Sequence, residues 1–369
     1  VFALCMAAAH ALAANATMVY VNGAQLTSAA PYWQNGGGSG LAAEPAGGWN
    51  AYFDTGTVIP TLKLDGAVID TPYISGSYQN LIYADGNIIL TLTGDSMLSH
   101  SVDIDGRLRG IYTPTDLVIA EAAGETGSLT ISITNTNGDG IAEGIRAFNS
   151  TTIESGTIDI AASGGDAAYA IYTVELRING GQITAGATSG DYARGIDCDN
   201  FYLTAGSIKV TASASPSDIA LWFENAFITG GEGRFESVNY HSAGWEEANA
   251  NQFSVTGGRL IFSCANGAAF FFDAYVYDNV LPNSTVPIWV SADSGGAGKA
   301  VWDSSMGLLA SYYYNSGTSN YKYVEFSETG GESPQTGDAQ TPRLWLCAGL
   351  TALLGAAGAA MLLRRKRRA

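Results

Sequence analysis

ESGTIDI (residues 154–160) returns three times along the chain in altered form, each time 25 residues later: as NGGQITA (179–185), TAGSIKV (204–210) and TGGEGRF (229–235). Each copy keeps a glycine at the same place, and VTGGRLIF extends the series at Gly258. A fixed period of this length is typical of a solenoid, in which each repeat buries its apolar side only against its neighbours. The repeats therefore predict an all-β chain of stacked coils.

A second strand precedes each of these glycines: GIRAF from Gly144, AIYTV from Ala170, GIDCD from Gly195 and ALWFE from Ala220. Units of strand, turn and strand make a parallel β-helix, here with roughly seven or eight coils. Because successive side chains of a strand point to opposite faces, alternation also predicts the interior. The side chains expected inside are Ile145, Ala147, Ile171, Thr173, Ile196, Cys198, Leu221 and Phe223.

The residues between these interior positions should form a column on the outside, one coil apart. Its members are Tyr83, Tyr112, Arg146, Tyr172, Asp197 and Trp222. Aromatic rings stack on sugar rings, while Arg and Asp supply hydrogen bonds. The column therefore predicts a polysaccharide-binding groove formed by Tyr112, Arg146, Tyr172, Asp197 and Trp222. The alternative is that Tyr and Trp stand here because they favour strands or pack under a loop.

An acidic cluster accompanies the column. Asp197 and Asp199 are two residues apart, and Glu224 lies one coil further on. Carboxylates so spaced suit a calcium ion, or the paired acids of a glycoside hydrolase. A polysaccharide lyase would also need a base, and the chain lacks the histidine motif or Arg–Lys strand of pectin-cleaving β-helices. We therefore expect a binding protein and no enzyme; a hydrolase or lyase, and a passive spacer without any site, remain the alternatives.

The segment NTNGDG (135–140) has the residue types of a cation loop but lacks the downstream glutamate of an EF-hand. Asn and Gly tolerate positive φ, so the simpler prediction is a turn.

The C-terminal end combines three features. SPQTG comprises Ser333, Pro334, Gln335, Thr336 and Gly337, and residues 344–363 follow as 20 residues without a charge. A helix of that length spans about 30 Å, the thickness of one hydrocarbon core. Five of the last six residues are Lys or Arg, which marks the cytoplasmic side of a membrane helix. The rest of the chain is thus predicted to lie outside the cell.

The N-terminal segment VFALCMAAAHALA (1–13) is apolar and ends in an A-x-A pattern. It reads as the rear part of a secretory signal whose basic front is missing.

The charge balance of the body excludes some partners. Residues 14–336 contain 11 Lys and Arg against 33 Asp and Glu, a net charge of −22. Such a surface repels nucleic acid and anionic lipid. Cys198 and Cys264 do not make a disulfide framework, and His100 and His241 are too few for a histidine metal site or a catalytic triad.

The order of SPQTG, spacer, apolar run and basic tail resembles the sorting signal of Gram-positive cell-wall proteins. Together with the repeats, the chain resembles sortase-sorted, right-handed parallel β-helix surface proteins and is similar to carbohydrate-binding β-helix proteins. The resemblance implies that a sortase cysteine attacks the Thr336 carbonyl, that Gly337 leaves with the tail, and that Thr336 is joined to peptidoglycan. It also implies a cell-wall location and a polysaccharide or host glycan as ligand. Ser333 stands where leucine is commonest, which leaves the sortase class open.

The expected parts follow one another in a simple order. They are a truncated signal peptide (1–13), an N-terminal β cap (14–60), the parallel β-helix (61–282), a C-terminal β module (283–326), a spacer with the sorting motif (327–343), a transmembrane helix (344–363) and a basic cytoplasmic tail (364–369).

Overall fold

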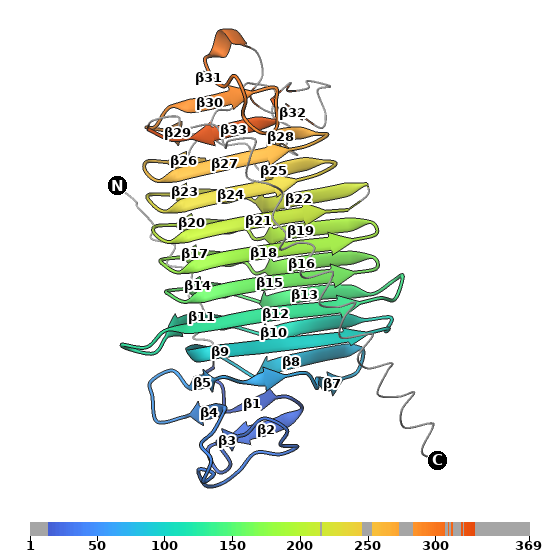
Figure 1. Ribbon diagram of the computed structural model, residues 1–369, viewed down its shortest axis with the longest axis vertical. Helices are drawn as coiled ribbons and strands as arrows, with labels where there is room; N and C mark the ends of the chain where they lie inside the picture. The colour runs from blue at the N-terminus through green and yellow to red at the C-terminus, as the bar shows by residue number, and fades with distance from the viewer. Residues whose placement is uncertain are drawn as a thin grey trace, which may run out of the picture. The chain divides into compact units, whose positions relative to one another are not determined.

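The computed structural model of the chain describes residues 14–214, 216–245, 253–272, 283–306, 309, 311–312, 319 and 321–328. They form an all-β parallel solenoid of about 8 coils, whose rungs are stacked in chain order (Figure 1). The helical content of this described part is one 3₁₀ turn, η1 (Ser304–Met306). The all-β solenoid predicted from the repeats is therefore confirmed.

Each coil contains three strands, and these build three sheets, which we call sheets I, II and III. Sheet I contains β8 (Tyr78–Ala84), β10 (Arg107–Thr113), β13 (Ile141–Ala147), β16 (Ala167–Tyr172), β19 (Tyr192–Asp197), β22 (Ser217–Phe223), β25 (His241–Trp245), β28 (Ala268–Phe272) and β32 (Ser311–Tyr312). Sheet II contains β5 (Thr61–Asp65), the first part of β9 (Ile88–Val102), β11 (Asp116–Glu121), β14 (Ser150–Ile153), β17 (Glu175–Ile178), β20 (Asn200–Leu203), β23 (Asn225–Ile228), β26 (Phe253–Val255) and β29 (Asn283–Ser284). Sheet III contains β6 (Val68–Ile69), the second part of β9, β12 (Gly127–Asn135), β15 (Thr157–Gly164), β18 (Gln182–Ser189), β21 (Ser207–Ser213), β24 (Glu232–Ser237) and β27 (Arg259–Cys264).

The sequence pattern predicts only two strands per coil, those of sheets I and III. The strands of sheet II escape it because they are short and follow sheet I almost directly: β13 ends at Ala147 and β14 begins at Ser150. A corner of two residues without Gly or Pro does not interrupt the apolar alternation, so the two strands read as one.

The glycines that define the repeat occupy the corner between sheets II and III. Gly156, Gly181, Gly206, Gly231 and Gly258 all have positive φ, between 74° and 100°. A Cβ atom on Gly181 would lie 2.6 Å from the carbonyl oxygen of Gly156 in the preceding coil. Only glycine combines this backbone conformation with so close an approach, which explains why the 25-residue period is so plain in the sequence.

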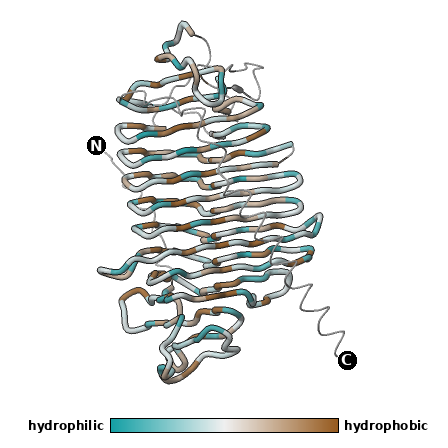
Figure 2. Tube along the Cα trace, viewed as in Figure 1, coloured by the Kyte–Doolittle hydropathy of each residue, from teal (hydrophilic) through white to brown (hydrophobic). Residues whose placement is uncertain are grey.

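The interior is close to the one that alternation predicts. All eight expected side chains, from Ile145 to Phe223, are buried. Figure 2 shows apolar and polar stretches following one another along the rungs. Later coils fill the same space with aromatic rings: Phe235, Phe253, Phe262 and Phe270 are fully buried, with neighbouring centroids 4.6–6.5 Å apart. Cys198 and Cys264 are buried free thiols whose pKa is raised by burial, which fits a packing role.

Sheet I contains a bulge that repeats in successive coils. In β10 both Gly110 and Ile111 face inward, and the strand pairing skips Gly110. A Cβ on Gly110 would lie 2.5 Å from Cγ2 of Ile131 in sheet III, and the equivalent positions are Gly144, Ala170, Gly195 and Ala220. Each strand has the same number of residues here, and it is the two consecutive inward residues that shift the alternation of side chains, so outward residues stand on both sides of this bulge.

Antiparallel strands close both ends of the solenoid. At the N-terminal end, β1 (Met18–Val21) pairs with β2 (Ala24–Thr27) and β8, β3 (Tyr32–Trp33) and β4 (Ala51–Asp54) lead to β5, and β7 (Tyr73–Ser75) pairs with β8. At the other end, β33 (Tyr323–Phe326) runs antiparallel to β27 and β30 (Ile288–Ser291), and β30 pairs with β31 (Ala300–Val301). Open strand edges would otherwise invite pairing with other chains.

The signal segment 1–13, the sorting motif Ser333 to Gly337, the apolar run 344–363 and the basic tail lie outside the described residues. Among the residues that the structure describes, no helix is both long enough and apolar enough to cross a membrane.

Candidate functional site

The outer face of sheet I carries the column predicted from the sequence. The strand register aligns Tyr83, Tyr112, Arg146, Tyr172, Asp197 and Trp222 in successive coils. At the N-terminal end, Tyr20 of β1 joins the same column opposite Tyr83.

A second outward column lies on the other side of the bulge, and the alternation of apolar residues in the sequence does not predict it. It consists of Asn80, Arg109, Glu143, Tyr169, Arg194, Ile219 and His241. Strict alternation, counted back from the buried Ile or Leu of each strand, assigns these residues to the interior, because it does not allow for two consecutive inward residues. The recurring Gly or Ala directly before each buried Ile or Leu is the signal that could have revealed it.

Three arginines of this face each lie over two aromatic rings, and these contacts connect neighbouring coils and both columns. The guanidinium carbon of Arg109 lies 4.5 Å from the centres of the Tyr78 and Tyr112 rings. That of Arg146 lies 3.4 Å from the centre of Tyr172 and 4.3 Å from that of Phe148. That of Arg194 lies 4.3 Å from the centre of Trp222 and 4.8 Å from that of Tyr192. Cation–π contacts of this kind are worth about 0.5 to 2 kcal/mol each, depending on exposure.

Along the sheet I strands from β8 to β28, two carboxylates, Glu143 and Asp197, stand at outward positions, and arginines bind both. Glu143 is completely buried and accepts hydrogen bonds from Arg107 and Arg109, each at 2.5 Å. Asp197 accepts one from Arg194 at 2.6 Å and is 9% exposed. Burial raises the pKa of Asp197, and the positive charges of Arg194 and Arg146 oppose that rise only in part. Neither carboxylate is placed to reach a ligand in solution.

The rings of the column stack on one another as well as on arginines. Tyr83 and Tyr112 are stacked with centroids 5.5 Å apart, and Tyr169 and Tyr172 at 4.9 Å. Their faces are therefore largely covered, and the surface presents ring edges, phenol hydroxyls and guanidinium N–H groups. This differs from the predicted mode of contact, in which open ring faces would stack on sugars.

Accessibility changes along the column. Tyr83, Tyr112, Arg146 and Tyr172 are half-buried, whereas Trp222 is only 8% exposed. The Trp222 ring lies over Gly244 of the next coil, where any side chain would collide with it. The accessible part of the predicted groove is thus its N-terminal half, and Asp197 and Trp222 do not belong to it.

The predicted acidic cluster is split between a strand and a corner. Strand β19 ends at Asp197, so its alternation does not extend to Asp199, which lies in the corner between sheets I and II. The backbone N–H of Glu224 donates to the carbonyl of Asp199 at 3.0 Å, which places these residues in adjacent coils of that corner. Among the described residues, no three Asp, Glu, His or Cys side chains lie close enough together to bind a metal ion. Asp197, Asp199 and Glu224 therefore do not form the predicted calcium site.

The segment 135–140 is a hydrogen-bonded turn. The buried Asn135 side chain accepts from the Ile104 N–H at 3.2 Å and donates to the carbonyls of Ile104 and Gly106 at 3.1 Å. Asn137 accepts from the N–H of Asp139 at 3.1 Å. These bonds give the two asparagine side chains a role in the turn.

Comparisons with known proteins add no relative: no family model, no curated protein and no solved structure matches the chain. The fold and the geometry of its surfaces therefore carry the functional argument.

Proposed function

We propose that the chain is a surface-displayed polysaccharide-binding protein whose ligand lies along the outer face of sheet I. The main support for this proposal is that Tyr83, Tyr112, Arg146 and Tyr172 lie in consecutive coils on one face, where all four side chains are half-buried. Coils repeat at about 4.8 Å, so an extended polymer meets a new set of donors at each coil.

The chemistry of the face supports a glycan ligand. Phenol hydroxyls and guanidinium groups donate hydrogen bonds, and ring edges give apolar contact. Stacking between coils fixes these side chains before a ligand arrives, which lowers the entropy lost on binding.

Display at the cell wall rests on the C-terminal sequence. SPQTG (Ser333 to Gly337), the apolar run 344–363 and the basic tail support attachment by a sortase to peptidoglycan through Thr336. The resemblance that includes this signal also supports a right-handed solenoid, secretion, and a membrane helix that holds the chain before sorting.

Affinity electrophoresis of the purified chain, preceded by a glycan array, tests the binding face. Single Tyr112→Ala, Arg146→Ala and Tyr172→Ala changes should weaken binding about two- to thirty-fold, because each contact contributes about 0.5 to 2 kcal/mol. If the double change of Tyr112 and Tyr172 leaves every bound polysaccharide unaffected, the face is not the site. Release of sugar products that depends on Asp197 would favour the hydrolase or lyase alternative, and a chain that binds no glycan would be a spacer.

A further inference from the structure

Sheet II carries a second ordered strip on its outer face, which no prediction from the sequence anticipated. Its central ridge occupies one position in six successive coils: Ile89, Val118, Thr152, Arg177, Tyr202 and Phe227. All six side chains are half-buried. The guanidinium carbon of Arg177 lies 4.0 Å from the centre of the Tyr202 ring, and Tyr202 stacks on Phe227 at 5.3 Å. The ridge is apolar or aromatic at both ends, and Thr152 and Arg177 lie between these ends.

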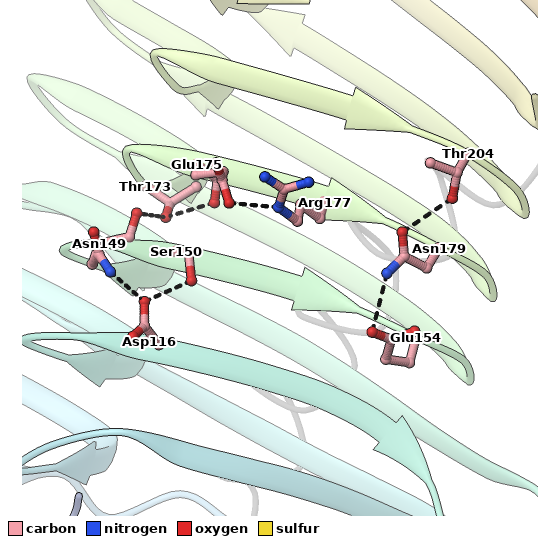
Figure 3. A network of polar contacts seen from close by, with 9 residues as sticks. All are labelled: Asp116, Asn149, Ser150, Glu154, Thr173, Glu175, Arg177, Asn179 and Thr204. Atoms are coloured by element: carbon pink, nitrogen blue, oxygen red, sulfur yellow. Dashed lines mark hydrogen bonds and ion pairs between the residues drawn. The ribbon is translucent and has the colours of Figure 1, made fainter. Parts of the chain in front are cut away.

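A row of polar side chains follows one side of this ridge, with members Asp116, Ser150, Glu175, Asn200 and Asn225 in register. Asp116 accepts hydrogen bonds from Asn149 at 2.5 Å and from Ser150 at 2.6 Å (Figure 3). Further along, Asn225 donates to the side chain of Asn200 at 3.0 Å. Hydrogen bonds thus link neighbouring coils at both ends of this row.

A second polar row follows the other side of the ridge. Asn179 donates to Glu154 in the preceding coil at 3.0 Å, and Thr204 donates to Asn179 from the following coil at 3.0 Å (Figure 3). All three side chains are exposed. The same figure shows Arg177 of the ridge bound to Glu175 of the first row.

The charge and hydrogen-bonding character of this strip differ from those of sheet I. Asp116, Glu154 and Glu175 outnumber Arg177, so the strip is acidic and repels polyanions. Asn, Ser and Thr side chains offer both donors and acceptors, as sugar hydroxyls do. A ridge with apolar or aromatic ends between two such rows matches a sugar chain, whose ring faces are apolar and whose rims carry hydroxyls.

We propose that this strip, from Val118 to Phe227, is a second carbohydrate-binding face that takes a neutral, hydroxyl-rich polysaccharide lying along the solenoid axis. The hydrogen bonds between coils hold the polar rows in place before binding, which reduces the side-chain entropy lost. The site is separate from the face of sheet I, and its existence does not depend on that face binding a ligand.

The test is affinity electrophoresis of the full chain in gels containing one neutral polymer each: dextran, galactomannan, xyloglucan or mixed-linkage β-glucan, with polygalacturonate as the acidic comparison. The Tyr202→Ala/Phe227→Ala double variant should lose retardation by at least one neutral polymer about tenfold or more, because two ring contacts are removed. The matched control is Tyr112→Ala/Tyr172→Ala on sheet I, which should retain that retardation. Asn179→Ala interrupts only the exposed polar row and should weaken binding of the same polymer, although no ring is removed. This variant replaces the double variant in the test if the double variant does not fold.

Three outcomes would overturn the proposal. The first is that none of the neutral polymers retards the unmodified chain. The second is that the sheet I control loses the neutral polymer while the sheet II variants keep it. The third is a dimer in light scattering that dissociates in the Tyr202→Ala/Phe227→Ala variant, since the strip would then be an interface between two copies of the chain.

Discussion

The guanidinium carbon of Arg146 lies 3.4 Å from the centre of the Tyr172 ring, one coil further along the outer face of sheet I. Arg109 and Arg194 are placed over rings in the same way. A face built of such contacts is ordered before a ligand arrives, and its polar edges, more than its ring faces, are left for recognition.

Arg146 should therefore affect both folding and binding, to different extents. Arg146→Ala is expected to lower the free energy of unfolding by only about 0.5 to 2 kcal/mol, because its cation–π contacts are half-exposed. The affinity for the sheet I ligand should also fall, because the Arg146 guanidinium takes part in no ion pair among the described residues and its N–H groups can bind the ligand. Urea denaturation and affinity electrophoresis measure the two effects.

Ile171→Ala is the matched control for that variant, one residue before Tyr172 on the same strand. Its side chain is fully buried, so the change should cost about 2 to 5 kcal/mol of stability. Equal losses of stability in Arg146→Ala and Ile171→Ala would contradict the assignment of outward and inward positions.

The glycine ladder allows its two constraints to be separated. Gly206→Ala should destabilise by several kcal/mol, because φ is +76° and the new Cβ would lie 2.7 Å from the carbonyl oxygen of Gly181. Gly36→Ala introduces only the strain of φ +80° and should cost about 1 kcal/mol, since nothing lies within 4 Å. Gly38→Ala has neither constraint and should be nearly neutral. Thermal unfolding of the three variants must rank them in this order.

These glycines explain why the architecture could be predicted from the sequence. Positive φ and the close approach to the coil below leave no other residue at Gly181 or Gly206, so the period of the structure is visible in the chain itself. The inward positions of Ile171 and Ile196 follow from alternation within single strands. Both signals are local.

The parts that escaped prediction depend on relations that a single strand does not show. The bulge at Gly110 changes which residues face outward, and so Arg109, Glu143 and Arg194 were overlooked. The ridge through Arg177 and Tyr202 was not predicted because only one or two residues, none of them Gly or Pro, separate β14, β17, β20 and β23 from the sheet I strands that precede them. Coverage of Trp222 and of the Tyr172 ring face arises from neighbouring coils, which the order of residues alone does not reveal.

His241 gives the solenoid a defined response to mild acid. Its ring stacks on Phe271 at 4.4 Å and lies 4.1 Å from Tyr240, and burial lowers its pKa to about 4, although a hydrogen bond to the Ala268 carbonyl and the charge of Asp218 act in the opposite direction. Since the unfolded chain binds a proton near pH 6.5 and the folded chain only near 4, stability should fall as the pH drops through that window, by up to about 3 kcal/mol. His241→Phe should remove this component. Urea titrations at pH 7, 5.5 and 4.5 should therefore show the variant losing less stability than the parent; parallel losses would contradict the assignment.

Glu325 should respond in a more acidic range. Burial alone would raise its pKa, but hydrogen bonds from Lys299, Tyr323 and Arg259 outweigh burial and hold the pKa below its usual value. A carboxylate with a depressed pKa stabilises the fold above its unfolded pKa, and that contribution is lost as the pH falls through the folded value. Glu325→Gln should therefore cost about 3 kcal/mol at pH 7, because the nearly buried Lys299 and the partly exposed Arg259 lose the carboxylate that pairs with them. The difference from the parent chain should shrink below about pH 4, and a difference that stays constant down to pH 2 would refute this account of the C-terminal cap.

The proposed attachment to the cell wall makes the last prediction. If a sortase cleaves after Thr336, replacing Thr336 and Gly337 with alanine removes both the acyl donor and the small residue that leaves with the tail. The variant should then stay with the membrane fraction through the apolar run 344–363, whereas the parent chain should appear in wall fragments released by muramidase. Gln335→Ala is the matched control, because it changes the motif at the position between the proline and the threonine and should still be sorted. Recovery of the Thr336→Ala/Gly337→Ala variant from wall fragments at the parental level would show that SPQTG is not the signal, and loss of both proteins from the wall would favour a membrane anchor alone.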